Sequence, residues 1–356
     1  MNVLISAGGT GGHIYPAISI INKIKEKEPD SKFLYIGTLD RMEKDIIPNL
    51  GIDYIGIKIT GVSKNPLKLM KFIYYNIKEE KHLEKIIKKF KPDIAIGVGG
   101  YVTVPVILSA KKLGVKTMLH EQNSVPGKAN RLLSKYADTV CTSMKSSNKY
   151  FKHSNIVYTG NPRAEEALKC ERANKKDYGL SLTKKLVLIT TGSLGASTVN
   201  DKIKECIPCF SKKNYEVLLV TGKNSYEEMK KYSTKNVKIV PYLEKMDEVL
   251  KVTDLIISRA GATIISEITT VGVPSILIPS PYVANNHQEI NALDLESNNA
   301  SIVIREKDLT KDLLINSIDK VLNDENEYKK LASNSKKLGT PHSATKIYEE
   351  IKKLLK

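Results

Sequence analysis

Short apolar runs alternate with amphipathic segments along the whole chain. After the run Asn2–Ser6, for example, Ile14, Ile18 and Ile21 share one helical face, and Pro16 is expected in the first turn of that helix. Runs too short for a helix are typical of strands, and strands that alternate with helices build open parallel sheets. The predicted strands are 2–6, 33–36, 54–59, 93–96 and 116–120 in the first half, and 186–190, 215–220, 237–240, 255–258 and 275–279 in the second. The pattern predicts an α/β fold with two Rossmann-like open parallel sheets.

The segment 255–292 carries the clearest pattern in the second half. A strand at 255–258 leads through the small-residue turn Arg259–Thr263 into a helix that Gly272 ends, and a polar loop is expected at 284–292. A helix that opens directly after a strand points free N–H groups at a ligand, which suits an anion. Glu267, about one turn in, suits ribose hydroxyls, so the combination indicates a nucleoside diphosphate. The alternative is an ordinary strand–helix unit with Glu267 on a solvated face.

Other loops of binding character also follow predicted strands. Gly8–Gly12 holds four glycines in five positions, and further loops follow at 97–101, 121–127 and 192–197. The first loop has neither the dinucleotide-binding nor the Walker spacing. Because ligands of open α/β sheets bind at the carboxyl ends of the strands, we expect these loops to form a site.

The turn-forming group Thr159–Arg163 indicates a domain boundary. The predicted domains are 1–162 and 163–340, with a C-terminal helix at about 341–356 that packs back on the first domain. Two sheets with binding loops imply a ligand in the cleft between them.

Composition narrows the class of partner. The 356 residues include 56 Lys and Arg against 39 Asp and Glu, which gives a net charge of +17. This charge fits an anionic membrane, nucleic acid, or a coding bias toward Lys, and the absence of any nucleic-acid module argues against nucleic acid. No signal peptide and no apolar run of about 18 residues is present, so the cytoplasm is the expected compartment. The pair Cys206 and Cys209 has redox spacing but lies at the end of a predicted helix, which favours a structural role.

The chain contains no Asp-x-Asp pair and no metal-ligand spacing of Cys and His, so no metal and no cofactor are expected. A leaving diphosphate must then be stabilised by helix N-termini, N–H groups and Arg.

Residues 64–91 combine apolar and aromatic side chains with basic flanks. This composition is typical of an interfacial helix on anionic lipid, and also of a core helix whose lysines extend to water. The residues concerned are Leu67, Lys68, Leu69, Met70, Lys71, Phe72 and Ile73.

Seven motifs in order over nearly the whole chain make a more specific pattern. They are Gly8-Gly9-Thr10-Gly11-Gly12-His13, Gly99-Gly100-Tyr101-Val102, His120-Glu121-Gln122-Asn123, Gly160-Asn161-Pro162-Arg163, Gly192-Ser193-Leu194-Gly195-Ala196, Ser258-Arg259-Ala260-Gly261-Ala262 with Ser266-Glu267, and His287-Gln288 with Asn291-Ala292. In these motifs the chain resembles the MurG family of glycosyltransferase family 28. The resemblance implies a GT-B fold and inverting, metal-independent transfer of N-acetylglucosamine from UDP-N-acetylglucosamine to the C4 hydroxyl of the muramyl sugar of lipid I, giving lipid II.

The resemblance also implies roles for residues that match the family motifs. The C-terminal half would bind the UDP-sugar, with Glu267 on the ribose, Ser193 on the diphosphate and Leu243 on uracil. The remaining donor-binding residues would be Ala262, Thr263 and Ile264 on phosphate, His287 and Gln288 on the sugar, and Thr10, Gly11, Gly12, His13, Asn123 and Arg163 from the other domain.

The N-terminal half would bind the acceptor, through Gly9, Gly99, Gly100 and Tyr101. An inverting transfer needs a general base, for which His13 is the candidate and Glu121 the alternative; a purely orienting role for His13 stays open. The lipid-linked acceptor also favours a peripheral position on the cytoplasmic face of the cell membrane, with the 67–73 segment on anionic lipid and other cell-wall synthesis proteins as further partners.

Two positions depart from the family pattern: Thr191 replaces a glycine and Ile264 replaces a threonine, which leaves Ile264 only its backbone for phosphate. Three alternatives remain. They are a transferase with a diacylglycerol-type acceptor, a UDP-sugar 2-epimerase, and a nucleotide-sugar binding protein.

Overall fold

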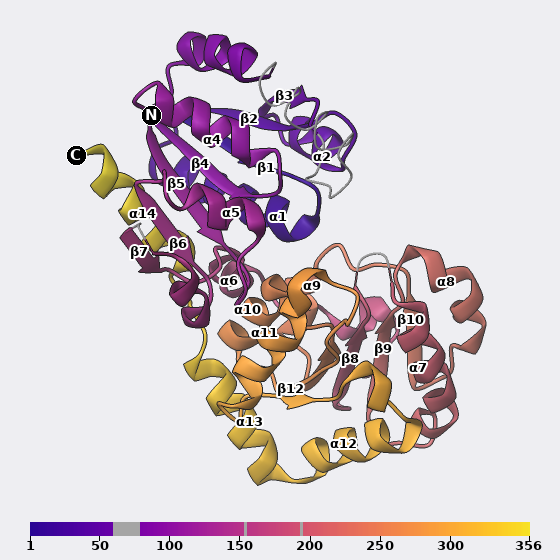
Figure 1. Ribbon diagram of the computed structural model, residues 1–356. Coiled ribbons are helices and arrows are strands. Elements are labelled where there is room, and N and C mark those ends of the chain that lie inside the picture. Colours follow the sequence, from indigo (N-terminus) through magenta and orange to yellow (C-terminus); the bar gives the residue numbers. More distant parts are fainter. Residues whose placement is uncertain (60–78, 153–154, 193–194) are drawn as a thin grey trace. The chain divides into compact units, whose positions relative to one another are not determined.

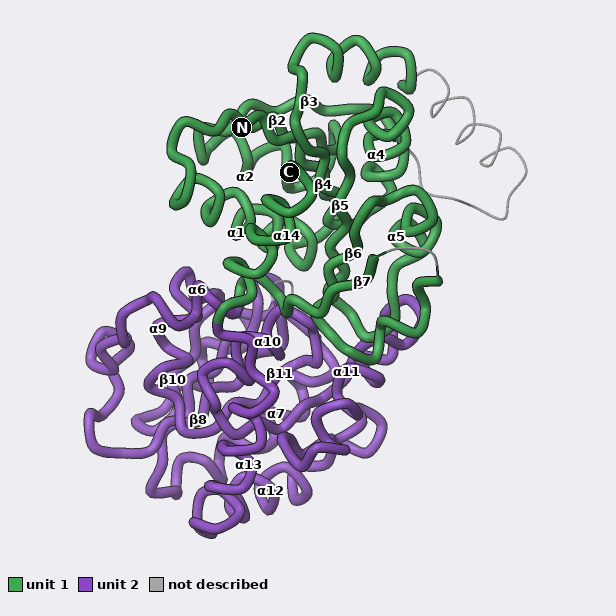
Figure 2. The backbone as a smooth tube through the Cα atoms, turned by 90° about the vertical axis from the view of Figure 1, so that its left-hand side faces the viewer, with its two compact units in different colours: residues 1–163, 342–356 green, residues 164–341 purple. Residues whose placement is uncertain are grey.

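The computed structural model describes residues 1–59, 79–152, 155–192 and 195–356. Two compact units divide the chain (Figure 2): unit 1 comprises Met1–Arg163 with His342–Lys356, and unit 2 comprises Ala164–Pro341.

Unit 1 is built on a parallel sheet of seven strands in the order β3-β2-β1-β4-β5-β6-β7 (Figure 1). The strands are β1 (Asn2–Ala7), β2 (Lys32–Thr38), β3 (Asp53–Ile57), β4 (Ile94–Gly99), β5 (Lys116–Glu121), β6 (Thr139–Thr142) and β7 (Asn155–Tyr158). Its helices are α1 (Gly11–Lys27), α2 (Glu43–Asn49), α4 (Thr103–Lys112), α5 (Lys128–Leu133), the 3-10 helix η1 (Lys145–Tyr150) and α14 (Ser343–Leu355), and residues 79–90 are also helical.

The two faces of this sheet are covered by different helices. Val3 and Ile5 of β1 pack in the same core as residues of α1 and α14, whereas Leu4 packs with residues of α4 and α5. This alternation is expected of a strand buried on both faces. Helix α14 lies against α1, and Tyr348 donates its hydroxyl to Glu28 at 2.8 Å. The last helix of the chain therefore completes the first core.

Unit 2 has a parallel sheet of six strands in the order β10-β9-β8-β11-β12-β13. The strands are β8 (Leu186–Thr190), β9 (Glu216–Val220), β10 (Val237–Val240), β11 (Leu255–Ser258), β12 (Ser275–Leu277) and β13 (Ile302–Val303). Its α-helices are α6 (Arg163–Lys169), α7 (Ser197–Phe210), α8 (Lys223–Met229), α9 (Met246–Leu250), α10 (Ala262–Val271), α11 (His287–Glu296), α12 (Lys311–Asn323) and α13 (Glu325–Lys337), and its 3-10 helices are η2 (Lys175–Tyr178), η3 (Lys230–Tyr232), η4 (Ala284–Asn286) and η5 (Glu306–Asp308). Phe210 of α7, Ile257 of β11 and Leu314 of α12 share one core.

The structure confirms the predicted fold class of two open parallel sheets and corrects several element boundaries. Helix α1 begins at Gly11, so Pro16 lies beyond the first turn, where its missing N–H leaves the carbonyl of Gly12 without its usual partner. Strand β4 extends through Gly99, so part of the expected glycine loop is strand.

The predicted polar loop at 284–292 is wrong. Helix α11 begins at His287, after Asn285 and Asn286 adopt left-handed backbone conformations with φ of 55° and 49°. Asparagine tolerates this region, so these residues turn the chain directly into a helix.

Candidate active site

Three loops of unit 1 meet at the carboxyl edge of its sheet, where the neighbouring strands β1, β4 and β5 end (Figure 1). Gly8 donates its N–H to the carbonyl of Gly99 at 3.1 Å, and Gln122 Nε2 donates to the carbonyl of Val98 at 2.9 Å. A Cβ atom at Gly100 would lie 2.6 Å from the carbonyl oxygen of Gly8, so this approach requires glycine. The structure brings the three predicted loops together.

His13 lies in the first turn of α1, with its ring against Gly99. Its Nδ1 is 3.0 Å from the carbonyl oxygen of Gly8. Because a carbonyl oxygen only accepts hydrogen bonds, Nδ1 carries the hydrogen, and the neutral ring has its lone pair on Nε2. The loop thus holds His13 in the tautomer whose Nε2 can accept a proton.

The start of α1 also suits an anionic group. Thr10 is its N-cap, no acidic residue lies in its first turn, and Gly11 and Gly12 present backbone N–H groups without side-chain bulk. Gly9 and Thr10 are exposed, and Tyr101 is partly exposed on the adjacent loop. The positive end of the helix dipole therefore faces accessible backbone.

Glu121, the alternative base, is 2% exposed and holds the loop that follows it. Its Oε1 accepts from the N–H and Nδ2 of Asn123 at 3.0 and 3.3 Å. Its Oε2 accepts from the N–H of Gly127 at 3.1 Å and from Nδ2 of Asn130 at 2.9 Å. Both oxygens are therefore occupied by donors of the protein.

In unit 2, the turn after β11 opens into α10, whose N-cap is Gly261. The N–H groups of Ala262, Thr263 and Ile264 lie in the first turn, where no preceding helical carbonyl can accept from them. The Thr263 hydroxyl is buried and has no hydrogen-bond partner among the described residues. Glu267 is 4% exposed, so the solvated-face alternative for this carboxylate is wrong.

Gln288 lies in the first turn of α11 and is held toward the end of β12. Its Oε1 accepts the N–H of Ser280 at 2.9 Å, which leaves its Nε2 as a donor. The neighbouring His287 has its Nδ1 2.8 Å from the carbonyl oxygen of Ala284. Asn291 Nδ2 donates to the carbonyl of Ala260 at 3.1 Å and so joins α11 to the turn before α10.

Further contacts brace the loops of unit 2. Arg259 forms an ion pair with Glu306 at 2.7 Å and donates to the carbonyl of Ile278 at 3.2 Å. Thr191, which departs from the family pattern, donates its hydroxyl to Asn200 Oδ1 at 3.2 Å, so the threonine is accommodated.

The remaining predicted residues lie as follows. Leu243 is buried after β10, and Arg163 is half-buried at the end of unit 1, with its N–H on Asn161 Oδ1 at 3.1 Å. Ser193 and the predicted membrane residues Leu67, Lys68, Leu69, Met70, Lys71, Phe72 and Ile73 lie outside the described residues.

Sequence reasoning missed two buried polar residues beside the unit 1 loops. Asn130 donates to Glu121 and to the carbonyl of His120, and Glu43 accepts from the glycine-rich loop. Glu43 follows the carboxyl end of β2, which lies next to β1. Its position in the segment that follows a predicted strand was the signal that could have identified Glu43 in the sequence, but no glycine cluster marks this segment as it marks the other loops.

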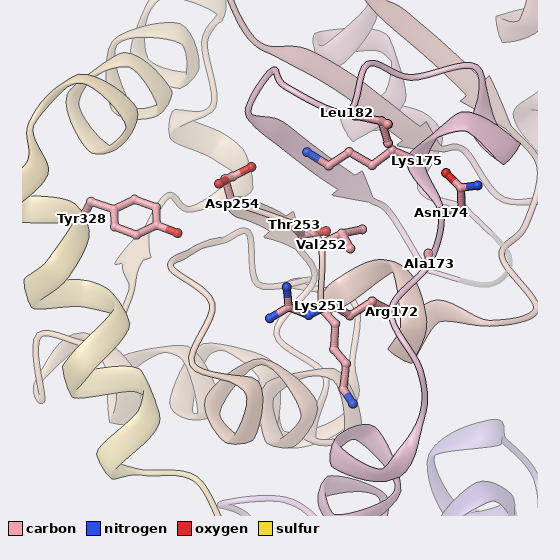
Figure 3. A pocket seen from close by; sticks show the side chains of 10 residues that line it. All are labelled: Arg172, Ala173, Asn174, Lys175, Leu182, Lys251, Val252, Thr253, Asp254 and Tyr328. Atoms are coloured by element: carbon pink, nitrogen blue, oxygen red, sulfur yellow. The ribbon is translucent and has the colours of Figure 1, made fainter.

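A cavity of about 630 Å³ lies elsewhere in unit 2, beside the residues that precede β8 and β11 (Figure 3). Its polar groups serve local structure: Asp254 accepts the N–H of Leu186 at 2.7 Å, and Lys175 donates to the carbonyl of Lys184 at 2.9 Å. It lies at the amino edge of the sheet and contains none of the predicted site residues.

Within the described residues, no helix has the length and apolar character needed to cross a membrane. The same part of the chain holds no group of three or more His, Cys, Asp or Glu side chains arranged for a metal ion.

Two Rossmann-like units with binding loops at the carboxyl edges of their parallel sheets are typical of the GT-B fold. Residues 3–142 match the glycosyltransferase family 28 N-terminal domain, and residues 186–351 match the C-terminal domain of the same family. The chain belongs to glycosyltransferase family 28 and is a glycosyltransferase, as predicted.

Curated relatives match over full length. The chain is 45% identical to the Bacillus cereus UDP-N-acetylglucosamine–N-acetylmuramyl-(pentapeptide) pyrophosphoryl-undecaprenol N-acetylglucosamine transferase 1, covering 100% of both chains. It is 42% identical to the Bacillus licheniformis transferase of the same type, covering 99% of both.

Solved structures agree on the fold. The Acinetobacter baumannii MurG structure matches with a TM-score of 0.79 at 25% identity over 99% of both chains. An S. aureus MnaA–UDP structure matches with a TM-score of 0.71 at 18% identity, covering 100% of this chain and 97% of that one, which shows a shared fold alone.

Proposed function

We propose that this chain transfers N-acetylglucosamine from UDP-N-acetylglucosamine to the C4 hydroxyl of the muramyl sugar of lipid I, giving lipid II for peptidoglycan synthesis. Support comes from the full-length identity of 45% to a transferase named for this donor and acceptor. The shared fold alone would not distinguish this activity from an epimerase, because UDP-N-acetylglucosamine 2-epimerases have it at 16% identity.

The carboxyl edge of unit 2 would bind the donor. The N–H groups of Ala262, Thr263 and Ile264 and the partnerless hydroxyl of Thr263 suit the diphosphate, since a helix N-terminus favours negative charge. Glu267 would accept from ribose hydroxyls, and Leu243 would contact uracil through its backbone. Nε2 of Gln288 would donate to the sugar, with His287 beside it.

The loops of unit 1 would bind the acceptor and activate its hydroxyl. The observation that most directly supports His13 as the base is the hydrogen bond from its Nδ1 to the Gly8 carbonyl, because this bond leaves the lone pair on Nε2. Nε2 takes the proton of the C4 hydroxyl while the oxygen attacks the anomeric carbon. The bond from that carbon to the β-phosphate oxygen breaks, and UDP departs with the electron pair.

His13 suits this role better than Glu121, because four donors already occupy the Glu121 carboxylate. Gly9, Gly99, Gly100 and Tyr101 would line the acceptor site, and the start of α1 would face the acceptor pyrophosphate. Thr10, Gly11, Gly12, Asn123 and Arg163 would contact the donor sugar and phosphates from unit 1.

A lipid-linked acceptor also calls for attachment to the membrane. We assign the 67–73 segment to anionic lipid on the cytoplasmic face, where the chain would be peripheral. The net charge of +17 supports attraction to such a surface. Other cell-wall synthesis proteins would be partners there.

Transfer of labelled N-acetylglucosamine to a lipid I analogue tests the proposal. The reaction is run with and without chelator, because the proposed mechanism needs no metal ion. Labelled lipid II in both reactions is the expected result. Epimerised or hydrolysed donor without glycosylated lipid would overturn the transferase, and product on diacylglycerol alone would overturn the acceptor.

A further inference from the structure

Glu43, on helix α2, is a fully buried carboxylate that the reaction described above does not use. The adjacent residues Met42 and Lys44 are exposed, so α2 turns this one acidic side chain into the interior of unit 1. A buried carboxylate is costly unless hydrogen bonds hold it, so its partners are informative.

Its two oxygens serve different segments. Oε1 accepts from the N–H of Thr38 at 3.1 Å and from its hydroxyl at 2.8 Å, at the carboxyl end of β2. Oε2 accepts from the N–H of Gly9 at 3.3 Å, in the glycine-rich loop. Glu43 therefore ties this loop to the strand beside β1.

The surroundings leave room for the carboxylate only because glycines line it. A Cβ atom at Gly8 would lie 2.6 Å from Glu43 Oε1, and one at Gly37 would lie 2.7 Å from Glu43 Cγ. Such distances are far inside van der Waals contact. Gly8 thus combines two roles, making space for Glu43 and accepting from His13.

The peptide between Gly8 and Gly9 connects Glu43 to His13. The N–H of this peptide group belongs to Gly9 and donates to Glu43. Its carbonyl belongs to Gly8 and accepts from His13 Nδ1 at 3.0 Å. One planar peptide group therefore has the carboxylate on one side and the imidazole on the other, and its plane fixes both directions at once. A hydrogen bond accepted by an anion also polarises the peptide and strengthens its carbonyl as an acceptor.

We propose that Glu43 is a positioning residue that acts through the Gly8–Gly9 peptide to keep His13 in the tautomer that presents an unprotonated Nε2. The inference rests on the proposed role of His13 as the base. Glu43 itself touches neither substrate in this proposal. In a catalytic triad a carboxylate orients the catalytic histidine by bonding to its ring, whereas Glu43 would orient His13 through the intervening peptide group.

Glu43→Gln is the sharpest variant, because it keeps the shape but turns one accepting oxygen into an NH₂ group. The new NH₂ group would lie opposite either Gly9 or Thr38. Thr38 presents two donors, its N–H and its hydroxyl, so the remaining oxygen should stay on that side and the NH₂ group should face the N–H of Gly9. We expect kcat to fall about 10-fold or more while KM for UDP-N-acetylglucosamine changes less than about threefold.

The decisive readout is the tautomer of His13, measured by ¹⁵N NMR of its ring at about pH 8, where an ordinary imidazole is neutral. The signal is assigned by its loss in His13→Ala. In wild type we expect the hydrogen on Nδ1, and in Glu43→Gln a shift toward the hydrogen on Nε2. An unchanged tautomer in a folded Glu43→Gln protein would overturn the proposal.

Thr38→Val is the matched control, because it removes one bond to Glu43 and leaves the Gly9 bond in place. We expect its tautomer to match wild type and its kcat to stay within about threefold. If Thr38→Val shifts the tautomer as much as Glu43→Gln, Glu43 has only a general packing role and the proposal fails. If Glu43→Gln does not fold, the experiment is repeated with Glu43→Asp. Amide hydrogen exchange then shows whether the shorter side chain has lost the bond from the Gly9 N–H. If that bond is lost and the His13 tautomer is unchanged, the proposal fails.

Failure of the proposed function has a different signature. If wild type makes no lipid II but the tautomer follows Glu43, the positioning role holds and the transferase does not. If wild type is active and the tautomer ignores Glu43, the reverse is true.

Discussion

The two sheet edges share one architecture but use carboxylates in opposite ways. In unit 1, Glu121 and Glu43 accept backbone N–H groups of the loops, including those of Asn123, Gly127 and Gly9. In unit 2, the N–H groups at the start of α10 lie in a first turn capped by a glycine, and the Thr263 hydroxyl has no partner in the described structure.

This difference matches the chemistry of the proposed substrates. A loop that must aim one imidazole benefits from internal hydrogen bonds that fix its shape. A loop that must hold a diphosphate benefits from donors that stay available. In unit 1, carboxylates of the protein therefore accept the N–H groups of Gly9, Asn123 and Gly127, whereas in the proposed donor site of unit 2 the N–H groups at the start of α10 would bind the anion of the ligand.

Glu121→Gln should test the structural use of carboxylates in unit 1. The new NH₂ group would face two donors that the carboxylate now accepts, and we expect unit 1 to lose about 3 kcal/mol of unfolding free energy. Hydrogen exchange of unit 1 peptides in urea measures this, since the two units need not unfold together. A stable variant that has lost only turnover would instead make Glu121 the base.

Glu267→Gln should have the opposite signature. We expect UDP-N-acetylglucosamine affinity to fall about 50-fold, or about 2.3 kcal/mol, with a smaller change in stability, because the carboxylate is assigned to the ribose. Calorimetric titration of the donor measures the loss.

Glu216→Gln is its matched control. Glu216 is also buried in unit 2, but it accepts the N–H of Ser181 at the amino end of β9. It should lose stability and keep donor affinity, and equal losses of affinity in both variants would remove Glu267 from the donor site.

The buried imidazole of His120 makes the stability of unit 1 depend on pH. Burial lowers the pKa of His120 from 6.5 to about 4, while the carbonyl of Gly160 opposes this shift. The unfolded chain therefore binds the proton first, so this contribution is complete above pH 6.5 and is lost as pH falls toward 4. Between pH 7.5 and pH 5 we expect a loss of about 2 kcal/mol.

The loss is obtained by comparing wild type with His120→Gln at both pH values by hydrogen exchange of unit 1. The difference between the two proteins should shrink at low pH. A difference that is independent of pH would show that His120 is not the group responsible.

Thr263→Val should have the smallest effect, and one of opposite signs on stability and binding. The buried Thr263 hydroxyl has no hydrogen-bond partner among the described residues to offset the cost of its desolvation. Removing it should therefore raise the free energy of unfolding by about 1 kcal/mol. UDP affinity should fall about fivefold through the lost phosphate contact. Thermal unfolding and UDP titration measure the two, and unchanged UDP affinity would remove this hydroxyl from the phosphate site.

Features that depend on backbone requirements were predictable from sequence. The glycines at 8–12 and 99–100 marked the unit 1 loops, and Gly272, which adopts φ of 86°, correctly ended α10. Glycine clusters can be recognised in a sequence as turns because few other residues adopt backbone conformations with positive φ.

Features that depend on tertiary contacts were not predictable. Glu43 resembles any acidic residue of a surface helix until the fold places it under the glycine-rich loop.

The start of α11 is polar and follows two asparagines, so local composition indicated a loop. Strand β13 has two residues and was too short to stand out from its neighbours. Strand β6 (Thr139–Thr142) was missed because only two of its four residues, Val140 and Cys141, are apolar.

The most direct test of this division between the two edges is His13→Ala, assayed for transfer to a lipid I analogue and for donor binding in the same preparation. We expect kcat to fall about 10³-fold, because the base is lost, while the affinity for UDP-N-acetylglucosamine stays within about threefold, because unit 2 holds the donor. Turnover close to wild type would exclude His13 as the base, and a parallel loss of donor affinity would show that unit 1 acts mainly by binding the donor.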